Sequence, residues 1–241
     1  MAAAAYHDDH MRSLTCQRLQ LDEIWAFCHS KAKNVPEEHK GKFGYGDVWT
    51  WVALDADTKL VPAFTLGGRN SAVAWEFVAD LSKRLANRVQ LTTDGNQMYL
   101  NAMDNAFAGQ VDYAMLVKRY GEDNVEGSRR YSPAEYSGSE KKIMTGDPDK
   151  KHISTSYVER QNLTMRMGMR RFTRLTNGFS KKVENMACAV SLHFLHYNFV
   201  RVHQSLKGRT PAMAAGLTDR RWTIEDIVML VEDAENSQNS N

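Results

Sequence analysis

The sequence has few cysteines and no long apolar run, and each shortage excludes a class of protein. Among its 241 residues the three cysteines, Cys16, Cys28 and Cys188, are scattered and form no Cys-x-x-Cys pair. Neither a disulfide framework nor a zinc ribbon is therefore expected. No stretch reaches the roughly 18 consecutive apolar residues of a membrane span, and the start of the chain lacks the pattern of a signal peptide. We expect an intracellular protein with no membrane partner.

The chain also has little net charge. Its 31 basic and 29 acidic residues give a formal net charge of +2, so a nucleic-acid partner can be argued only from where the positive charge lies. With 42% hydrophobic and 25% charged residues, the composition excludes a disordered chain. We expect one large domain with helical appendages.

Strand-like and helix-like segments alternate in the first half of the chain. The strand-like segments combine alternating character with bulky side chains, and the helix-like ones carry apolar residues at helical spacing. The order of three strands, helix, strand, helix and strand predicts an α/β fold with five strands. The predicted strands lie at 18–25, twice within 47–68, at 89–95 and at 111–121, and the predicted helices lie at 71–86 and 97–109.

The second half begins with a break in composition. Residues 122–153 are rich in Gly, Ser, Pro, Lys and Asp, which predicts a long mobile loop or insertion. Helical patterning resumes at Ser154 and continues through two helices and a shorter final one. The predicted divisions are an N-terminal arm at 1–17, a catalytic domain at 18–217, and a C-terminal helix with a polar tail at 218–241.

Three carboxylates have the distribution that two-metal phosphoryl transfer requires. Asp22 lies in the first strand, Asp94 ends a later strand before Gly95, and Glu159 lies near the start of a helix. Two Mg²⁺ ions need carboxylates from different elements, because one side chain cannot surround both ions. We therefore predict that Asp22, Asp94 and Glu159 are catalytic and bind metal.

Each of these carboxylates also has a purely structural interpretation. Ser156 and Glu159 have the spacing of a capping box, in which Glu159 would only bind backbone N–H groups of its own helix. Asp22 would then be a polar residue of an edge strand, and Asp94 a turn residue. Glu23 is excluded as a partner of Asp22, because strand alternation sends it to the opposite face.

Positive charge is concentrated after Glu159. Between residues 159 and 182 there are seven basic residues, and Glu159 is the only acid. On a helical wheel Asn162, Arg166 and Arg170 lie on the same flank as Glu159. A solvated helix face would look similar, but the nearby carboxylate favours contacts with a DNA backbone. The predicted DNA-binding residues are Asn162, Arg166, Arg170, Arg171, Arg174, Lys181 and Lys182.

Several blocks of the sequence resemble a known family. LDEIW, TTDG and YVERQNLTMRMGMRRFTRLTNGFSKK, which contain Asp22, Asp94 and Glu159, resemble the three catalytic blocks of bacterial insertion-sequence transposases of the DDE superfamily, particularly the insertion-sequence-one type. The segment YNFVRVHQSLKGRTPAMAAGL resembles a closing motif of such transposases and of integrases. The block around Glu159 is the most specific of these matches.

This resemblance implies a fold and an activity. The fold would be ribonuclease H-like, with a central mixed five-stranded sheet flanked by helices. The activity would be cleavage at element ends and strand transfer in double-stranded DNA, with two Mg²⁺ or Mn²⁺ ions. The implied setting is a homo-oligomer on DNA in the bacterial cytoplasm, associated with the nucleoid.

One departure leaves alternatives open. Such transposases usually carry an amino-terminal DNA-recognition segment, whereas only about 20 residues precede Asp22. That segment would be on a separate polypeptide or joined by frameshifting, or the chain would be a truncated relic. The alternative functions are a non-catalytic, transposon-derived DNA-binding or regulatory protein, and a ribonuclease H-like nuclease without strand transfer.

Overall fold

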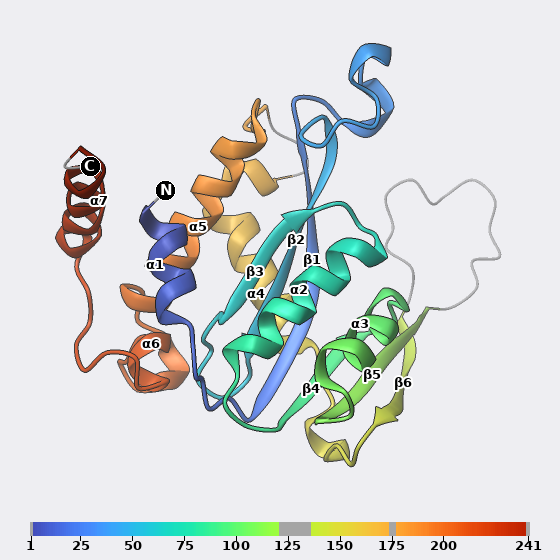
Figure 1. Cartoon of the computed structure of the whole chain (residues 1–241). Coiled ribbons are helices and arrows are strands. Elements are labelled where there is room, and N and C mark those ends of the chain that lie inside the picture. The colour runs from blue at the N-terminus through green and yellow to red at the C-terminus, as the bar shows by residue number, and fades with distance from the viewer. Residues whose placement is uncertain (1, 121–135, 174–176, 240–241) are drawn as a thin grey trace.

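A mixed six-stranded sheet forms the centre of the molecule (Figure 1). The computed structural model describes residues 2–120, 136–173 and 177–239. Within these ranges the strands are ordered β3-β2-β1-β4-β5-β6. Their bounds are β1 Arg18–Cys28, β2 Gly46–Asp55, β3 Ala63–Gly67, β4 Val89–Asp94, β5 Val111–Tyr120 and β6 Tyr136–Thr145.

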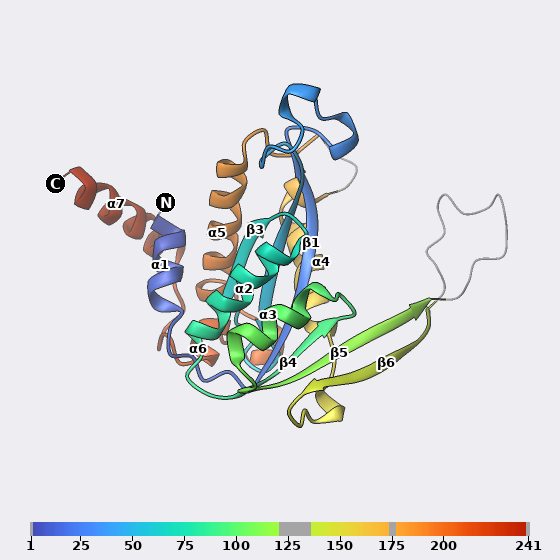
Figure 2. The same cartoon turned by 45° about the vertical axis from the view of Figure 1, so that its right-hand side comes forward.

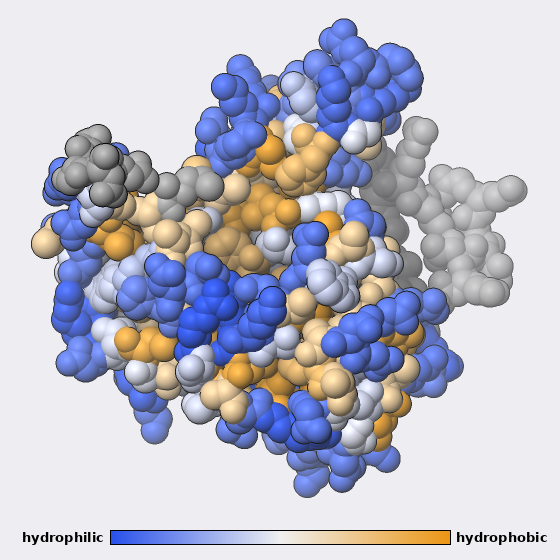
Figure 3. All heavy atoms as spheres, in the orientation of Figure 1, coloured by the Kyte–Doolittle hydropathy of each residue, from blue (hydrophilic) through white to orange (hydrophobic). Residues whose placement is uncertain are grey.

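Strand directions divide the sheet into two parts. β1, β2 and β3 form an antiparallel meander, whereas β1, β4 and β5 are parallel to one another. The β1–β2 connection, residues 29–45, is hydrophilic in the space-filling view (Figure 3). The predicted α/β class, a central mixed sheet flanked by helices, is confirmed.

Helices cover both faces of the sheet. α2 (Ser71–Arg84) and α3 (Met98–Phe107) lie on one face, and α4 (Ser156–Gly168) and α5 (Val183–Phe199) lie on the other (Figures 1 and 2). Side chains along β2 point alternately to the two faces of the sheet and so contribute to a hydrophobic cluster on each face. Trp51 packs in one cluster with Phe77 and Tyr99, while Val52 packs in the other. No helix in the described ranges has the length and apolar character that crossing a bilayer requires.

The sheet has one strand more than the sequence predicted. β6 lies within 122–153, the segment expected to be a loop or insertion, and pairs antiparallel with β5. Its side chains are mostly exposed, so it is held by backbone hydrogen bonds and carries no apolar alternation for the sequence to reveal. Residues 122–135 of the predicted loop lie outside the described residues, and β6 is the outer strand of the sheet in Figure 2.

The predicted helix after Ser154 is shorter than expected. α4 ends at Gly168, and Met169 has φ −126° and ψ 106°, which is extended backbone. A short 3₁₀ turn, η4 (Arg170–Phe172), follows. The helical wheel that grouped Arg170 with Glu159 was therefore wrong, because the two residues do not share one helix.

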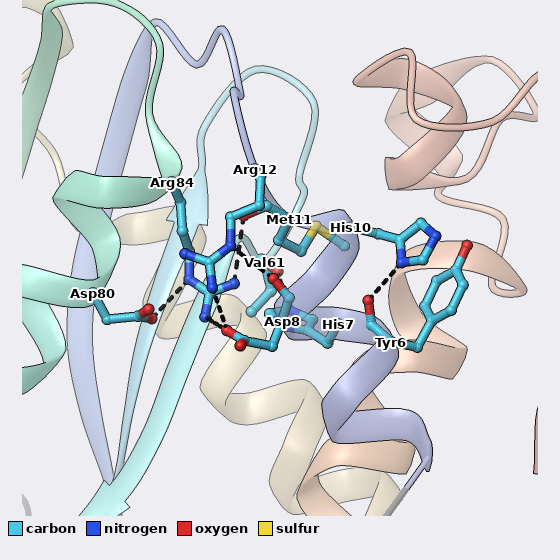
Figure 4. Close-up of polar contacts among 9 residues, drawn as sticks. All are labelled: Tyr6, His7, Asp8, His10, Met11, Arg12, Val61, Asp80 and Arg84. Carbon is cyan, nitrogen blue, oxygen red and sulfur yellow. Dashed lines mark hydrogen bonds and ion pairs between the residues drawn. The ribbon is translucent and has the colours of Figure 1, made fainter. Parts of the chain in front are cut away.

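The N-terminal arm is fixed to the domain by a buried arginine (Figure 4). The arm contains α1 (Ala2–His10), and the guanidinium of Arg84, which is 5% exposed, donates hydrogen bonds to Asp8 at 2.6 Å and Asp80 at 2.7 Å. His7 is the buried residue of α1: its Nε2 lies 3.1 Å from the carbonyl oxygen of Val61, and burial lowers the pKa of His7 to about 4. α6 (Pro211–Ala214) and α7 (Ile224–Asn239) complete the chain.

Replacing Arg84 with Met should destabilise the protein. The variant keeps most of the apolar stem but loses charge-assisted hydrogen bonds to two carboxylates, which we expect to lower the free energy of unfolding by about 2–3 kcal/mol. Chemical denaturation monitored by circular dichroism measures this difference. Arg12→Met is the matched control, because Arg12 forms an exposed pair with Asp8 worth less than about 0.5 kcal/mol. Equal effects of the two substitutions would contradict the role given to Arg84.

Candidate metal centre

Two of the predicted carboxylates meet between adjacent parallel strands. Asp22 lies in the middle of β1, and Asp94 is the last residue of β4. Together with Glu23 they form a group in which one carboxylate oxygen of each residue lies within 4.8 Å of the others. Carboxylate oxygens are the ligands that Mg²⁺ and Mn²⁺ prefer. The group is therefore a candidate site for a divalent cation.

Glu23 belongs to this group, contrary to the sequence-based prediction. The β1–β4 ladder covers only residues 18–20 and 90–92, so no backbone hydrogen bonds join the strands beside Asp22 and Asp94. Side chains from both faces of β1 can therefore reach the space between the strands, and the alternation rule no longer separates them. The carboxylate of Glu23 accepts hydrogen bonds from Arg69 Nε at 3.2 Å and from Asn96 Nδ2.

Asp22 and Glu23 are in an environment that disfavours the charge of their carboxylates. Burial, followed by the negative charges of Glu23 and Asp94, raises the pKa of Asp22 to about 7. Burial also raises the pKa of Glu23, although Tyr99 and then Arg69 partly counteract this effect. Like charges held together out of water are costly unless a cation neutralises them. The residues present thus fit a divalent metal.

Glu159 lies in the first turn of α4 but outside the group of three carboxylates. Its Oε1 accepts a hydrogen bond from Lys118 Nζ of β5 at 2.5 Å and another from Thr155 Oγ1 at 2.5 Å. The capping-box interpretation is not borne out, because neither bond goes to a backbone N–H group of the helix. Glu159 instead joins α4 to β5 through an ion pair.

Two polar residues dock α4 on β1. The side-chain oxygen of Gln20 accepts hydrogen bonds from the backbone N–H groups of Tyr157 and Val158, at 2.9 and 3.1 Å. One turn further along α4, Asn162 Nδ2 donates to Asp22 Oδ2 at 2.8 Å. Gln20 was not singled out from the sequence, and Asn162, predicted to contact DNA, is buried against Asp22.

The remaining predicted DNA-binding residues extend from α4 to the start of α5. Arg166 is partly buried on α4, and Arg170 and Arg171 belong to η4. Arg171 Nη1 donates to Ser180 Oγ at 2.6 Å, and Lys181 and Lys182 follow as exposed residues. Ser180 forms a β-bridge with Cys28, so these basic residues lie at the end of β1. Arg174 lies outside the described residues.

The sequence matches no protein-family model and no curated protein. Many solved structures are similar at low identity, and two of them serve as examples. One is the simian T-cell lymphotropic virus intasome in complex with PP2A regulatory subunit B56 gamma, with a TM-score of 0.47, 15% identity and coverage of 85% of this chain and 56% of that one. The other is the piggyBac transposase synaptic complex with hairpin DNA, with a TM-score of 0.39, 12% identity and coverage of 75% and 45%. The chain spans about half the length of these proteins, and the likeness assigns no role to any of its residues.

Replacing Asp22 with Asn should stabilise the metal-free protein. A folded-state pKa raised from 3.8 to about 7 means that the free energy of unfolding falls as pH rises between these values. Asn carries no charge and can still accept the bond from Asn162, so we expect Tm in EDTA to rise by roughly 5 °C above pH 7 and to change little below pH 4.

The same variant should lose any stabilisation by metal. Differential scanning fluorimetry with Mn²⁺ should raise the Tm of the wild-type protein but not that of Asp22→Asn, since a ligand is missing. Asp104→Asn is the control, because Asp104 is an exposed acidic residue of α3, and its Tm should respond to Mn²⁺ as that of the wild type does. A lower Tm of Asp22→Asn in EDTA would show that the carboxylate is not under electrostatic strain.

Proposed function

We propose that this chain is the catalytic domain of a DNA transposase of the DDE type. The activity would be cleavage of phosphodiesters at element ends, followed by joining of the freed 3′-hydroxyl to target DNA. The observation that carries the proposal is the pair of carboxylates, Asp22 and Asp94, held beside the helix that bears Glu159. The resemblance of the three sequence blocks to insertion-sequence transposases supports the same assignment.

Asp22, Asp94 and Glu159 would hold two Mg²⁺ or Mn²⁺ ions. Bound there, the ions would activate a water molecule or a DNA 3′-hydroxyl and stabilise the leaving oxygen. Asn162 would keep the carboxylate of Asp22 oriented through its 2.8 Å hydrogen bond. Glu23 would remain hydrogen-bonded to Arg69 and to Asn96, whose backbone N–H donates to Asp94 Oδ1 at 2.9 Å.

Lys118 would have a role that depends on the ligand state of Glu159. In this structure its ammonium neutralises Glu159, at 2.5 Å. If Glu159 binds a cation, we expect its ion pair with Lys118 to break and the ammonium to contact a phosphate oxygen of the DNA, because a lysine binds phosphate as a point charge. The ion pair would therefore keep Glu159 close to the centre until metal and DNA bind.

One observation favours a second candidate function. Glu159 is bound to Lys118 and is not a member of the carboxylate group, as would suit a transposon-derived protein that binds DNA without cutting it. Such a protein has no need for Asp22 and Glu23 in surroundings that disfavour their charge, since these weaken the fold. We therefore rank it second.

Double-stranded DNA would lie along the basic residues between α4 and α5, in a homo-oligomeric assembly. Arg170, Lys181 and Lys182 are exposed, and contacts from such residues to phosphates would position DNA without reading its sequence. Such contacts alone would not recognise the element ends. The surface would supply salt-sensitive affinity only.

Cleavage and joining of a labelled element-end duplex test the proposed chemistry. With Mn²⁺ or Mg²⁺ and the recognition segment supplied where it is separate, we expect products from the wild type and a loss of at least about 10³-fold, equivalent to about 4 kcal/mol, in Asp94→Asn and Glu159→Gln. Asp104→Asn should retain wild-type activity. Full activity of Glu159→Gln would show that Glu159 is not a metal ligand. DNA binding without products in the wild type and all variants would favour the second candidate function.

The salt dependence of DNA binding tests the basic surface. If Lys181 and Lys182 contact phosphates, replacing both with Ala should reduce the slope of log affinity against log salt by about 1.8, at about 0.9 per contact. Fluorescence anisotropy with a labelled duplex in EDTA measures the slope. Lys83→Ala is the control, because Lys83 is an exposed lysine of α2. An unchanged slope in the double variant would show that Lys181 and Lys182 do not contact the DNA.

A further inference from the structure

A polar cavity lies on the flank of α4 that faces away from the carboxylates of the candidate metal centre. It has a volume of about 430 Å³ and is formed by α4, the β2–β3 turn and the chain after α5. Tyr157, Arg160 and Gln161 line it from α4. Because successive helical residues are 100° apart, these side chains point away from the flank that carries Glu159 and Asn162. The cavity is thus separate from the metal centre.

Its charge is positive. Lys59, Arg160 and Arg201 line the cavity, and none of the described residues that line it is acidic. Arg160 and Arg201 are exposed, and neither forms an ion pair with a carboxylate in the described part of the chain. Arginines of this kind offer planar sets of donors that suit phosphate oxygens. The cavity therefore favours an anion, and in particular a phosphate.

One wall offers an aromatic ring. The ammonium of Lys59, which is 7% exposed and also donates to the carbonyl oxygen of Ala56, lies 3.6 Å from the centroid of the Tyr157 ring. Tyr157 is nevertheless 47% exposed, so the contact with Lys59 leaves much of the ring open to solvent. Nucleic-acid bases stack on such rings without regard to sequence.

A buried donor without a partner lies beside these groups. Gln161 is 3% exposed, and its side-chain nitrogen has no hydrogen-bond partner among the residues that the structure describes. A buried polar group left unpaired costs free energy, so its presence in a fold calls for an explanation. A ligand in the cavity whose oxygens accept a hydrogen bond from this nitrogen would explain why it is unpaired here.

We propose that this cavity binds one nucleotide unit of a DNA strand. Arg160 and Arg201 would hold the phosphate, and the base would stack on Tyr157. The volume lies within the range of about 300–1,000 Å³ usual for small ligands, which suits a single nucleotide. The inference rests on the proposed function only in taking the strand to be DNA, and it adds a second DNA contact across α4 from Glu159.

Binding of a labelled ten-nucleotide oligothymidylate tests this site. Measured by anisotropy with the full chain in EDTA, affinity should fall at least tenfold in the double variant Arg160→Gln/Arg201→Gln. It should fall about tenfold in Tyr157→Ala and be retained in Tyr157→Phe, because the base needs a ring rather than the hydroxyl. Arg209→Gln is the matched control, since Arg209 is an exposed arginine of the same region that does not line the cavity.

Three outcomes would overturn the inference. They are affinity within twofold of wild type in the double variant, an equal loss in Arg209→Gln, and tight binding of free thymidine 5′-monophosphate without binding of the oligonucleotide. The last result would identify a free-nucleotide site instead. Because the assay contains no metal, failure of the metal chemistry leaves it unchanged. Conversely, the cavity variants should keep the Mn²⁺-induced rise in Tm, so the two proposals fail separately.

Discussion

The docking of α4 on β1 is the constraint on which the arrangement of the candidate site depends. Gln20 and Asp22 are two residues apart, so their side chains lie on the same face of β1. Gln20 accepts the first free N–H groups of α4, and Asp22 accepts the amide of Asn162 one turn later. Two fixed points determine both the position and the rotation of a helix. Glu159, which lies between these two points on α4, is therefore held on the same flank of the helix as Asn162, where it pairs with Lys118.

The hydrogen bond that docks α4 also affects the ionisation of Asp22. The bond from Asn162 favours the ionised form of Asp22, but burial and the charges of Glu23 and Asp94 outweigh it and raise the pKa of Asp22 to about 7. A protein selected for stability alone would place apolar side chains at this point in the sheet. The packing of α2 to α5 on both faces supplies the stability that keeps these unfavourable charges together.

Short-range patterns predicted much of the fold, and the rest depended on contacts that have no local signature. The strand ending at Asp94 and the helix bearing Glu159 were predicted because alternation and helical spacing are properties of neighbouring residues. Gln20 looked like an ordinary polar strand residue, since its partners are 137 and 138 positions away. Glu23 was misjudged because the opening of the β1–β4 ladder is a tertiary feature. β6 was missed because an exposed edge strand needs no apolar pattern.

The helix that docks on β1 also separates two surfaces of different chemistry. Glu159 and Arg160 are neighbours in sequence, but a rotation of 100° directs one to the Lys118 ion pair and the other to the cavity beside Tyr157. Carboxylates attract cations on the first flank, and arginines attract phosphates on the second. Any movement of α4 relative to β1 would displace both surfaces together, because Gln20 and Asn162 hold the helix as one rigid element. Coupling between the two flanks therefore requires no pathway other than the helix itself.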